Sequence, residues 1–426
     1  YDLNAVPNRM RLAYRRDAFG ITDGTLTQVV DTAGGVYKFA YNGVRLTNLS
    51  FQGWSANFFY DTSNRLASVV RNGPIAYTNV NTRWTFGYNN TNGLLNRIVD
   101  PRSNAAISVG YDKYGRKTSE VDALGREVTT EYNTPGNRQM RSTDPMSNRT
   151  VNAFDRKGRV VSPTNALGYA TSYSYDERGN CVSVTDPMGH RTTSSYDERG
   201  NRLALTNALG QVTRWTYHPF HNKPLTATEP RGWVTRYTYD AAGNLLGTYD
   251  DLGIITRFGY TSNGLPESVT DANGHVSRIT YDAEGFPVAL IDAASNRTAW
   301  GRNELGWVLA TTNALGQVSR VSYDLNGKVV RKVDALSRTY ANLYDANGNL
   351  LARSDAKKMF VTNHYDAANQ ATQMVDRLGE KWNSTYTRRG ELEMNTDPLG
   401  RAVSNAYDAL GRPVSVADPL GQLTRT

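Results

Sequence analysis

A short pattern recurs about every 21 residues along most of this chain, and it restricts the possible folds more than any other feature. The pattern is Tyr-Asp-x-x-Gly, a short segment, Asp-x-x-Gly, and a second short segment, as in residues 175–195. Further units open at Tyr111, Tyr132, Phe154, Tyr196, Tyr217, Tyr239, Tyr260, Tyr281, Tyr323, Tyr344, Tyr365, Tyr386 and Tyr407, and Arg302 stands in phase where a tyrosine is expected. A fixed period of this length is typical of repeat arrays, in which each unit buries its apolar face against its neighbours.

The two four-residue motifs have the composition of tight turns. The Asp side chain can accept a hydrogen bond from the backbone two residues on, and the glycine supplies the positive φ that closes the turn. The glycines at this position include Gly179, Gly200, Gly243 and Gly285. Asn64, Asn369 and His221 occupy it in units without glycine, because Asn and His tolerate a positive φ better than most residues. The sequence therefore predicts a turn at each motif.

The segments between the turns have the alternation of β-strands. In Val212–Tyr217, the side chains of Thr213, Trp215 and Tyr217 share one face, and those of Arg214 and Thr216 share the other. Glycine and proline interrupt every stretch within about a dozen residues, which excludes ordinary helices. The expected fold is all-β, with two short antiparallel strands in each repeat and the repeats joined into one long strip.

The composition indicates a thin core. Hydrophobic residues make up 39% of the chain, and the mean hydropathy is −0.57. A sheet with one face in water fits this composition. We expect the repeat tyrosines to stack along one face as an aromatic seam in place of a deep core. These structural positions include Tyr175, Tyr196, Tyr239, Tyr281, Tyr323, Tyr344 and Tyr407.

Repeat regularity divides the chain softly near residue 100. Residues 1–99 form an irregular lead-in, which we expect to belong to the same sheet, and residues 100–426 form the regular array. In the lead-in, residues 31–34 keep a turn motif, residues 51–59 are aromatic and out of phase, and residues 71–87 resemble a longer loop or an insertion. Because the chain starts and stops within the pattern, we expect it to be part of a longer protein.

Charge and cysteine content exclude several classes of function. The formal net charge is +8 and the pI is about 9.3, but the charges are spread along the array, which argues against a specific nucleic-acid groove. Cys181 is the single cysteine, so no intrachain disulfide can form. No apolar run approaches the roughly 18–20 residues of a membrane span.

Few side chains are arranged for chemistry. His218 and His221 suggest a metal pair, but a turn that begins at Tyr217 explains both positions better. Residues 345–349 alternate oxygen ligands as a calcium loop does, yet they lack its glycine and its final acidic residue. The adjacent Asp250 and Asp251 cannot hold two carboxylates across a substrate. We therefore predict no catalytic residues, no metal, no cofactor and no enzyme activity.

One row of charges merits a functional hypothesis. Arg214, Arg236, Arg257, Arg278 and Arg320 occupy the same place in their repeats, on the face opposite the aromatic residues. If equivalent strands are two apart, these side chains lie about 10 Å from one another. Such a row could contact an acidic cargo or an anionic glycan. The alternative is a solvated strand face whose charges are balanced by nearby Asp and Glu.

The motifs resemble those of a known family. Residues 239–245 and 397–401 are similar to the YD repeats of bacterial Rhs proteins, of the C component of Tc toxins and, more distantly, of teneurins. The resemblance implies a strip of antiparallel strands that spirals into a hollow shell, which in toxin-bearing members holds a C-terminal effector. Pro413 and residues 418–421 have the spacing of the family's self-cleavage region, but Gln422 stands in place of leucine and Asp418 is in phase with the earlier turns.

Two functions remain open at this point. The first is a segment of a shell that encloses a toxin or effector, with the C-terminal effector or the rest of the shell as partner. The second is an adhesion or matrix protein that binds glycans or forms fibres through unpaired sheet edges. Either is expected to be secreted or to lie on the bacterial surface, after export by a specialised secretion system. About seventeen units, with two strands each at roughly 4.8 Å per strand, give a ribbon about 160 Å long, enough for around one turn of a shell.

Overall fold

A computed structural model describes residues 11–16, 22–30, 36–51, 54–72, 82–132, 138–303, 305–324, 326–357 and 360–425. Every regular element in these ranges is a β-strand, and the strands form two sheets. No helix in the described residues is long and apolar enough to cross a membrane. The prediction of an all-β fold is confirmed.

The first sheet has 14 strands. They are β1 (Arg11–Arg16), β2 (Thr22–Val30), β3 (Val36–Asn42), β4 (Arg45–Phe51), β5 (Trp54–Tyr60), β6 (Leu66–Asn72), β7 (Trp84–Tyr88), β8 (Leu95–Val99), β9 (Ala105–Tyr111), β10 (Lys117–Asp122), β11 (Glu127–Tyr132), β12 (Gln139–Thr143), β13 (Arg149–Phe154) and β14 (Val160–Thr164).

The second sheet has 25 strands. They are β15 (Ser172–Tyr175), β16 (Cys181–Thr185), β17 (Arg191–Tyr196), β18 (Arg202–Thr206), β19 (Val212–Tyr217), β20 (Pro224–Thr228), β21 (Val234–Tyr239), β22 (Leu245–Asp250), β23 (Gly253–Tyr260), β24 (Pro266–Asp271), β25 (Val276–Tyr281), β26 (Pro287–Ile291), β27 (Arg297–Arg302), β28 (Val308–Thr312), β29 (Val318–Tyr323), β30 (Val329–Val333), β31 (Thr339–Tyr344), β32 (Leu350–Ser354), β33 (Phe360–Tyr365), β34 (Ala371–Val375), β35 (Lys381–Tyr386), β36 (Leu392–Thr396), β37 (Ala402–Tyr407), β38 (Pro413–Ala417) and β39 (Leu423–Arg425).

Within each sheet, every strand pairs with the next strand in the chain, so the fold is a continuous antiparallel meander. The strip has two edges, each lined by one kind of turn. At the Tyr-Asp-x-x-Gly turns, which we call YD corners, an odd-numbered strand of the regular array leads into an even-numbered one. At the Asp-x-x-Gly turns, which we call DG corners, the even-numbered strand leads back. Residues 197–201 form a YD corner and residues 207–211 form a DG corner.

A register shift recurs at the tyrosine of the YD corner. In the pairing of β19 with β20 it falls between Thr216 and Tyr217, and in that of β25 with β26 between Thr280 and Tyr281. One extra residue on the following strand produces this bulge, which bends the strand and redirects the side chain beside it. The bulge therefore sets the direction of the tyrosine in each repeat.

The two sheets are separated at residues 165–171. Thr164 and Ala170 form an isolated bridge there, and the Thr171 N–H donates to the Pro163 carbonyl at 3.0 Å. Pro163 has no N–H to return a hydrogen bond, so the ladder between β14 and β15 cannot extend through it. The strip itself continues across this gap, because residues 165–169 still form a DG corner.

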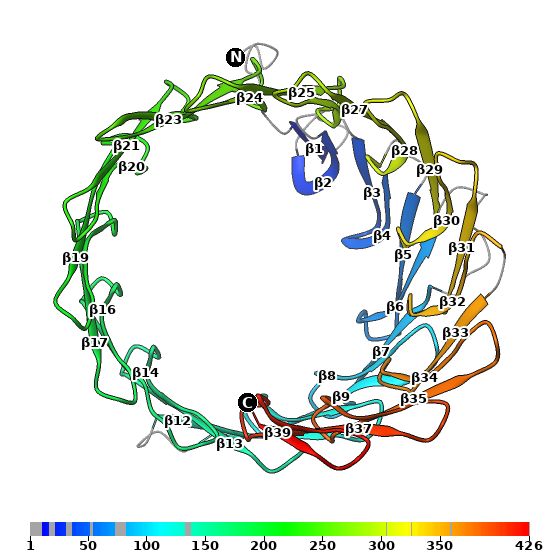
Figure 1. The fold of residues 1–426 in the computed structure, drawn as a ribbon. Helices are drawn as coiled ribbons and strands as arrows, with labels where there is room; N and C mark the ends of the chain where they lie inside the picture. The colour runs from blue at the N-terminus through cyan, green and yellow to red at the C-terminus, as the bar shows by residue number, and fades with distance from the viewer. Residues whose placement is uncertain are drawn as a thin grey trace.

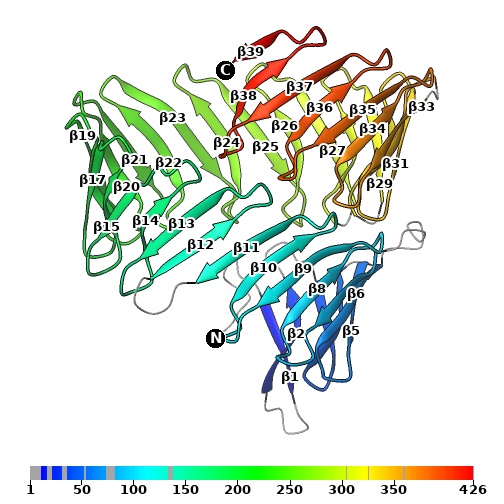
Figure 2. The same cartoon turned by 90° about the horizontal axis from the view of Figure 1, so that it is seen from below.

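Figure 1 shows that the strip closes into a ring in projection, with the C-terminal strands beside β8–β13. Figure 2, from below, shows β1–β8 on one side of this ring and the C-terminal strands on the other. Side-chain hydrogen bonds join Arg126 to Gln370, Asp144 to Arg389 and Asp100 to Asn347, which are separated by 244, 245 and 247 residues in the sequence. One turn of the spiral therefore takes about that many residues. The expectation of around one turn is wrong, because the strip curves more tightly than a circle made from its whole length. Among the described strands, β1 and β39 stand at the ends of the strip and each pairs with one neighbour.

The core is thin, as the composition predicts. Among the described residues, the buried hydrophobic side chains are Ala289 and Ala352, while Ser68, Thr82, Asp100, Ser183 and Ser354 are buried polar residues. No large apolar side chain of the described residues is fully buried, so much of the stability must come from the hydrogen-bonded ladder and its corners.

The lead-in is strand-rich as well. Residues 51–59 lie mostly in the hairpin of β4 and β5. Strands β6 and β7 pair with each other, and residues 73–81 between them lie outside the described residues. Residues 31–34, which carry a predicted turn motif, also lie outside the described residues. Strands β8 and β9 on either side of residue 100 are neighbours in the first sheet. The division into residues 1–99 and 100–426 stays a prediction.

Candidate functional site

Each corner is built around one Asp carboxylate. In the YD corner of Asp197, Oδ1 accepts the N–H groups of Arg199 and Asn201 at 2.9 and 2.8 Å, and Oδ2 accepts Asn201 Nδ2 at 2.8 Å. In the DG corner of Asp122, Arg126 is the fifth residue, as Asn201 is in the YD corner, and its Nε donates to Asp122 Oδ2 at 2.5 Å. The fifth residue is not part of the predicted turn motif, although Asn, Arg, His or Gln follows the corner glycine in many repeats.

The corner hydrogen bonds hold the carboxylates in the charged form. They lower the pKa of Asp176, Asp197 and Asp240, and in each case the side-chain amide of the fifth residue is the largest cause. These carboxylates therefore stabilise the corners by accepting hydrogen bonds. A carboxylate that accepts three hydrogen bonds is a weak base, which makes it a poor candidate for acid–base catalysis.

The corner glycines have the conformation that the turns require. Gly179, Gly200, Gly243 and Gly285 have φ values of 98°, 85°, 86° and 84°. Asn64 and Asn369 take the same conformation, with φ of 65° and 64°. The assignment of His221 to this position is wrong: Asn222 has the positive φ, of 51°, because this corner is one residue longer.

The repeat tyrosines act as latches across the YD edge. The Tyr196 hydroxyl donates to the carbonyl of Cys181 at 2.9 Å, fifteen residues earlier in the first position of β16. Strands β16 and β17 are joined by a turn at the opposite edge, and their ladder ends at Ser183 and Thr193. The tyrosine therefore ties the two strands together beyond the end of their ladder.

The same latch recurs along the array. The predicted tyrosines donate to carbonyls fifteen residues earlier, in the pairs Tyr175–Val160, Tyr239–Pro224, Tyr281–Pro266, Tyr323–Val308, Tyr344–Val329 and Tyr407–Leu392. The expected stacking of tyrosines on one another is wrong, because no two repeat tyrosines of the described residues are in ring contact. The bulge aims each ring at the backbone of the preceding strand.

Arg302 replaces a tyrosine and takes over its hydrogen bond. Its Nε donates to the Pro287 carbonyl at 2.8 Å, again fifteen residues earlier, and its Nη1 donates to the Gly306 carbonyl at 2.7 Å. A guanidinium can donate in two directions at once. The interruption in the sequence motif is therefore no interruption in the structure.

Successive turns of the spiral meet along a polar contact, which we call the seam. YD corners of the later turn sit on DG corners of the earlier turn. Arg102 Nη1 pairs with Asp345 Oδ2 at 3.3 Å, Arg126 Nη1 donates to Gln370 Oε1 at 2.8 Å, and Arg389 Nη1 pairs with Asp144 Oδ2 at 3.3 Å. These contacts fall at three successive repeats, and two arginines of the earlier turn and one of the later turn thus hold the two turns together.

Asp100 is the most buried carboxyl group of the seam. Its side chain accepts from Asn104 within its own corner and from Asn347 Nδ2 of the later turn at 2.6 Å. Asn347 belongs to the segment that resembles a calcium loop. There Asp345 Oδ1 accepts the N–H groups of Asn347 and Asn349 at 3.0 and 2.8 Å, as in other corners.

The seam also covers apolar side chains. The third residue of a DG corner is often Leu or Met, and Leu124 and Met146, under the later turn, are 44% and 43% exposed. At corners outside the seam, Leu209, Leu315 and Leu420 are 82%, 82% and 83% exposed. Contact between turns therefore buries roughly half of a side chain that is otherwise in water.

The structure places the predicted arginine row on one exposed face of β19, β21, β23, β25 and β29. Arg214, Arg257, Arg278 and Arg320 form no hydrogen bond or ion pair within the described residues, and Arg236 pairs with Asp251 at 2.9 Å. Arg236 is thus the one of the five with a direct carboxylate partner in the described residues, and the ligand-contact role of the row stays a prediction. Arg297 in β27 was not predicted as part of this row, because it lies two residues from the expected column in the sequence.

Other candidates prove to be parts of corners. The rings of His218 and His221 stack at 4.5 Å, and the His218 Nδ1 accepts backbone N–H groups as the corner Asp does. Asp418 Oδ1 accepts from Leu420 and Gln422, as in every regular DG corner. The described residues contain no group of three or more His, Cys, Asp or Glu that could hold a metal ion.

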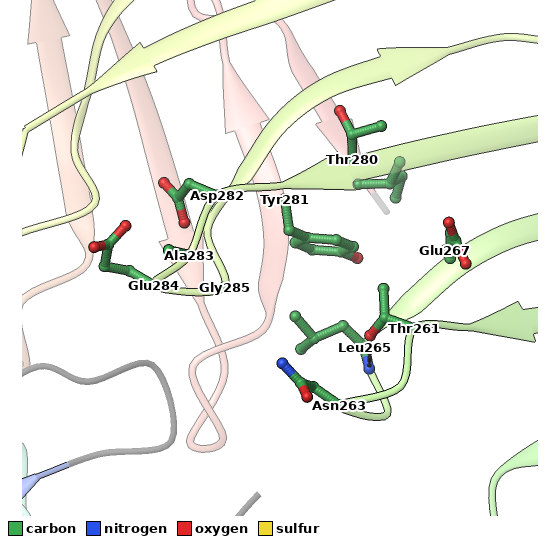
Figure 3. Close-up of a pocket in the computed structure, with 11 residues that line it drawn as sticks. Thr261, Asn263, Leu265, Glu267, Thr280, Tyr281, Asp282, Ala283, Glu284 and Gly285 are labelled. Atoms are coloured by element: carbon green, nitrogen blue, oxygen red, sulfur yellow. Dashed lines mark hydrogen bonds between the residues drawn. The ribbon is translucent and has the colours of Figure 1, made fainter. Parts of the chain in front are cut away.

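A hollow of about 420 Å³ lies between neighbouring YD corners (Figure 3). Tyr281 lies at its centre, with Asn263 and Leu265 on one corner and Asp282 on the next. Glu267 and Glu284 lie on opposite sides of the tyrosine ring in this view. The hollow is the gap that the repeat geometry leaves between two corners, and its carboxylates do not converge on one point.

Comparisons with known proteins agree with this geometry. The RHS Repeat model matches five overlapping segments, at residues 154–191, 175–210, 196–226, 221–255 and 239–276. The crystal structures of TcdB2-TccC3-TEV and TcdB2-TccC3-Cdc42 share the fold with TM-scores of 0.66 and 0.64, at 15% identity. Each match covers 96% of this chain, but 24% and 23% of the other. The chain thus spans about a quarter of the length of these structures. No curated protein sequence matches it.

Proposed function

We propose that the chain is a YD-repeat protein of the Rhs type and forms a segment of a shell that encloses or carries a toxin or other effector; the matches to the RHS Repeat model support this family. The overlap of two turns is the observation that supports this most strongly. A ribbon that seats its YD edge on the DG edge of its own preceding turn builds a wall, which an isolated flat sheet does not.

The seam supports a wall of fixed geometry. Its three arginines bridge corners that are 243–245 residues apart, so the number of repeats per turn is fixed by specific side chains. Partly buried hydrogen bonds to charged groups are stronger than neutral ones, which favours one register over its neighbours. A container needs such a register, because a slip by one repeat would open the wall.

We propose that this segment has a structural role and does not catalyse a reaction. The corner carboxylates, such as those of Asp176, Asp197 and Asp240, already accept hydrogen bonds from backbone and side-chain donors in their own corners. Any toxic activity would then belong to an effector outside this segment. The effector and the rest of the shell are the proposed partners, with export to the cell surface or beyond by a specialised secretion system.

Electron microscopy of the full parent polypeptide tests this function. We expect a hollow body whose wall contains this segment and whose interior holds density for the effector. Limited proteolysis of the same sample should spare the effector until the wall is cut. An empty wall with an accessible C-terminal domain would contradict enclosure, and a fibre would favour the second candidate, an adhesion or matrix protein. The exposed arginine row favours that candidate.

A further inference from the structure

The two edges that meet in the seam continue beyond it on opposite sides of the ring. In the seam, the YD edge of the later turn lies on the DG edge of the earlier turn. The earlier turn lies on one side of the ring and the later turn on the other (Figure 2), so the remaining edges face outward. We call them the outer YD edge (corners between residues 61 and 244) and the outer DG edge (corners between residues 186 and 422).

The outer DG edge carries a row of large apolar side chains. They occupy the third corner position, at which Leu124 and Met146 are partly covered in the seam. From Leu315 to Leu420, the corner with Lys357 is the one that lacks such a side chain, and this run is about 50 Å long at about 9.6 Å per repeat. The row comprises Met188, Leu209, Leu252, Leu315, Leu336, Leu378, Leu399 and Leu420, each between 68% and 96% exposed. Exposed apolar patches of this extent mark interaction sites.

The outer YD edge carries basic side chains in the same pose as Arg389. Arg389 is the third residue of its YD corner, and its Nη1 donates to the carbonyl of Ala409, 20 residues later in the next corner. Lys157 and Arg199 are the third residues of their YD corners, and each also donates to the carbonyl of a residue 20 positions later. This hydrogen bond holds the charged end of the side chain at the edge of the strip.

The three residues differ in what lies opposite them. Arg389 pairs with Asp144 across the seam at 3.3 Å. Lys157 and Arg199 form no ion pair within the described residues, and neither does Arg178, the third residue of the corner between them. Three successive corners of the outer YD edge thus present the bridging cation of the seam without the carboxylate that completes the bridge.

The outer DG edge presents the missing carboxylates. Asp144 is the first residue of its DG corner, and Asp397 and Asp418 hold the same position on the outer edge. One repeat separates these two residues, and one repeat separates Lys157 from Arg178, so two bridges can form at the same time. Because the outer edges of one molecule lie on opposite sides of the ring, they can meet only between two molecules.

We propose that the outer YD edge of one copy of this chain docks on the outer DG edge of a second copy, with the contacts of the seam. Lys157, Arg178 and Arg199 then face corner carboxylates, and the leucine row loses about half of its exposure, as Leu124 does. The two edges are different surfaces, so the contact is heterologous and leaves one free edge at each end. The copies stack into an open-ended column. This assembly requires no enclosed effector, so it can hold or fail independently of the shell function.

The mass of the purified chain in solution tests this proposal. Sedimentation velocity at low salt should give a weight-average mass that rises with concentration to more than twice the 47.2 kDa of one chain. Salt should weaken the assembly in part, because it screens the exposed ion pairs but not the contact of the leucines. Electron microscopy of the same sample should show rings stacked into columns.

Two edge variants and one control locate the contact. The YD-edge variant carries Lys157→Glu, Arg178→Glu and Arg199→Glu, and the DG-edge variant carries Leu378→Asp, Leu399→Asp and Leu420→Asp. The control carries Arg214→Glu, Arg257→Glu and Arg320→Glu, which make the same change of charge on an exposed strand face away from both edges. The control should assemble as the parent chain does.

Mixing the two edge variants gives the sharpest result. Each variant alone should be monomeric, because it lacks one of the two edges. An equimolar mixture should form dimers and nothing larger, because the intact DG edge of the first variant can meet only the intact YD edge of the second. The return of association in the mixture also shows that both variants are folded.

Several results would overturn the proposal. They are a parent chain that stays monomeric at every concentration, a mixture of edge variants that forms no dimer, and a control that loses association as fully as the YD-edge variant. A monomeric parent chain that floats with phosphatidylcholine vesicles, when the DG-edge variant does not, would assign the leucine row to a lipid surface instead.

Discussion

Replacement of Arg389 by methionine removes the most connected side chain of the seam while keeping much of its aliphatic volume. The Arg389 guanidinium pairs with Asp144 of the earlier turn at 3.3 Å and with Glu391 of its own corner. It also donates to the carbonyls of Ala409 and Asp408 at 2.7 and 2.9 Å. One residue thus joins two turns of the spiral and two neighbouring corners.

The expected cost follows from these contacts. The side chains of Arg389, Asp144 and Glu391 are 18%, 23% and 17% exposed, so water replaces the lost partners incompletely. Hydrogen bonds to charged groups contribute about 1.5–3 kcal/mol each. Asp144 keeps its bonds from Met146 and Asn148, which limits the loss at that carboxylate. We expect Arg389→Met to lower the free energy of unfolding by about 2–4 kcal/mol.

Urea unfolding followed by circular dichroism measures this change, and small-angle scattering below the transition shows whether the last turn has separated. The neighbouring Arg388 is exposed and has no partner in the described residues, so Arg388→Met should stay within about 0.5 kcal/mol of the parent. A double-mutant cycle with Asp144→Asn should give a coupling above about 0.5 kcal/mol. Equal stability of the two methionine variants, or zero coupling to Asp144, would refute the role of the seam.

Three further predictions concern the repeat itself. Tyr196→Phe keeps the ring but removes the hydroxyl that donates to Cys181 at 2.9 Å, so the free energy of unfolding should fall by about 1 kcal/mol in urea titrations; no change would exclude the latch. Arg302→Tyr restores the repeat residue and should preserve the melting temperature, whereas Arg302→Met, which cannot donate to Pro287, should lower it; equal melting of both variants would contradict the substitution argument. Corner carboxylates such as Asp176 and Asp197 have a lowered pKa in the folded state, so their stabilisation is complete above the unfolded value of about 3.9 and is lost as pH falls through the lower folded value. Melting temperatures should therefore decrease steeply below about pH 4 and less steeply in an Asp197→Asn variant; parallel pH profiles would dismiss this contribution.

The sequence was sufficient to predict the local structure. Asp and Gly at fixed separation specify the turns, and alternation in segments such as Val212–Tyr217 specifies strands, because both depend on residues close in the chain. The resemblance between repeats extended this prediction over the array. Regularity also misled in places: His221 occupies the motif position, but the positive φ belongs to Asn222 in a longer corner.

Contacts between distant residues could not be predicted. The pairing of Arg389 with Asp144 depends on curvature accumulated over 245 residues, and no local pattern encodes that sum. The tyrosine latch was missed for a different reason: the bulge between Ser195 and Tyr196 redirects the side chain, and simple alternation contains no bulge. Similarly, Arg297 lies two residues from the expected arginine column in the sequence. It shares the face of Arg278 because both residues are opposite Ile291 on β26.

The spiral overlap can be measured directly by double electron–electron resonance. Nitroxide labels are attached to cysteines introduced at Met146 and Arg388, in a Cys181→Ser background. The two labelled positions flank the contact between Asp144 and Arg389. The account predicts a single short distance across the seam, together with a much longer one for a control pair at Met146 and Arg278. A long or broad distance for the seam pair, as in an open ribbon, would contradict the spiral wall.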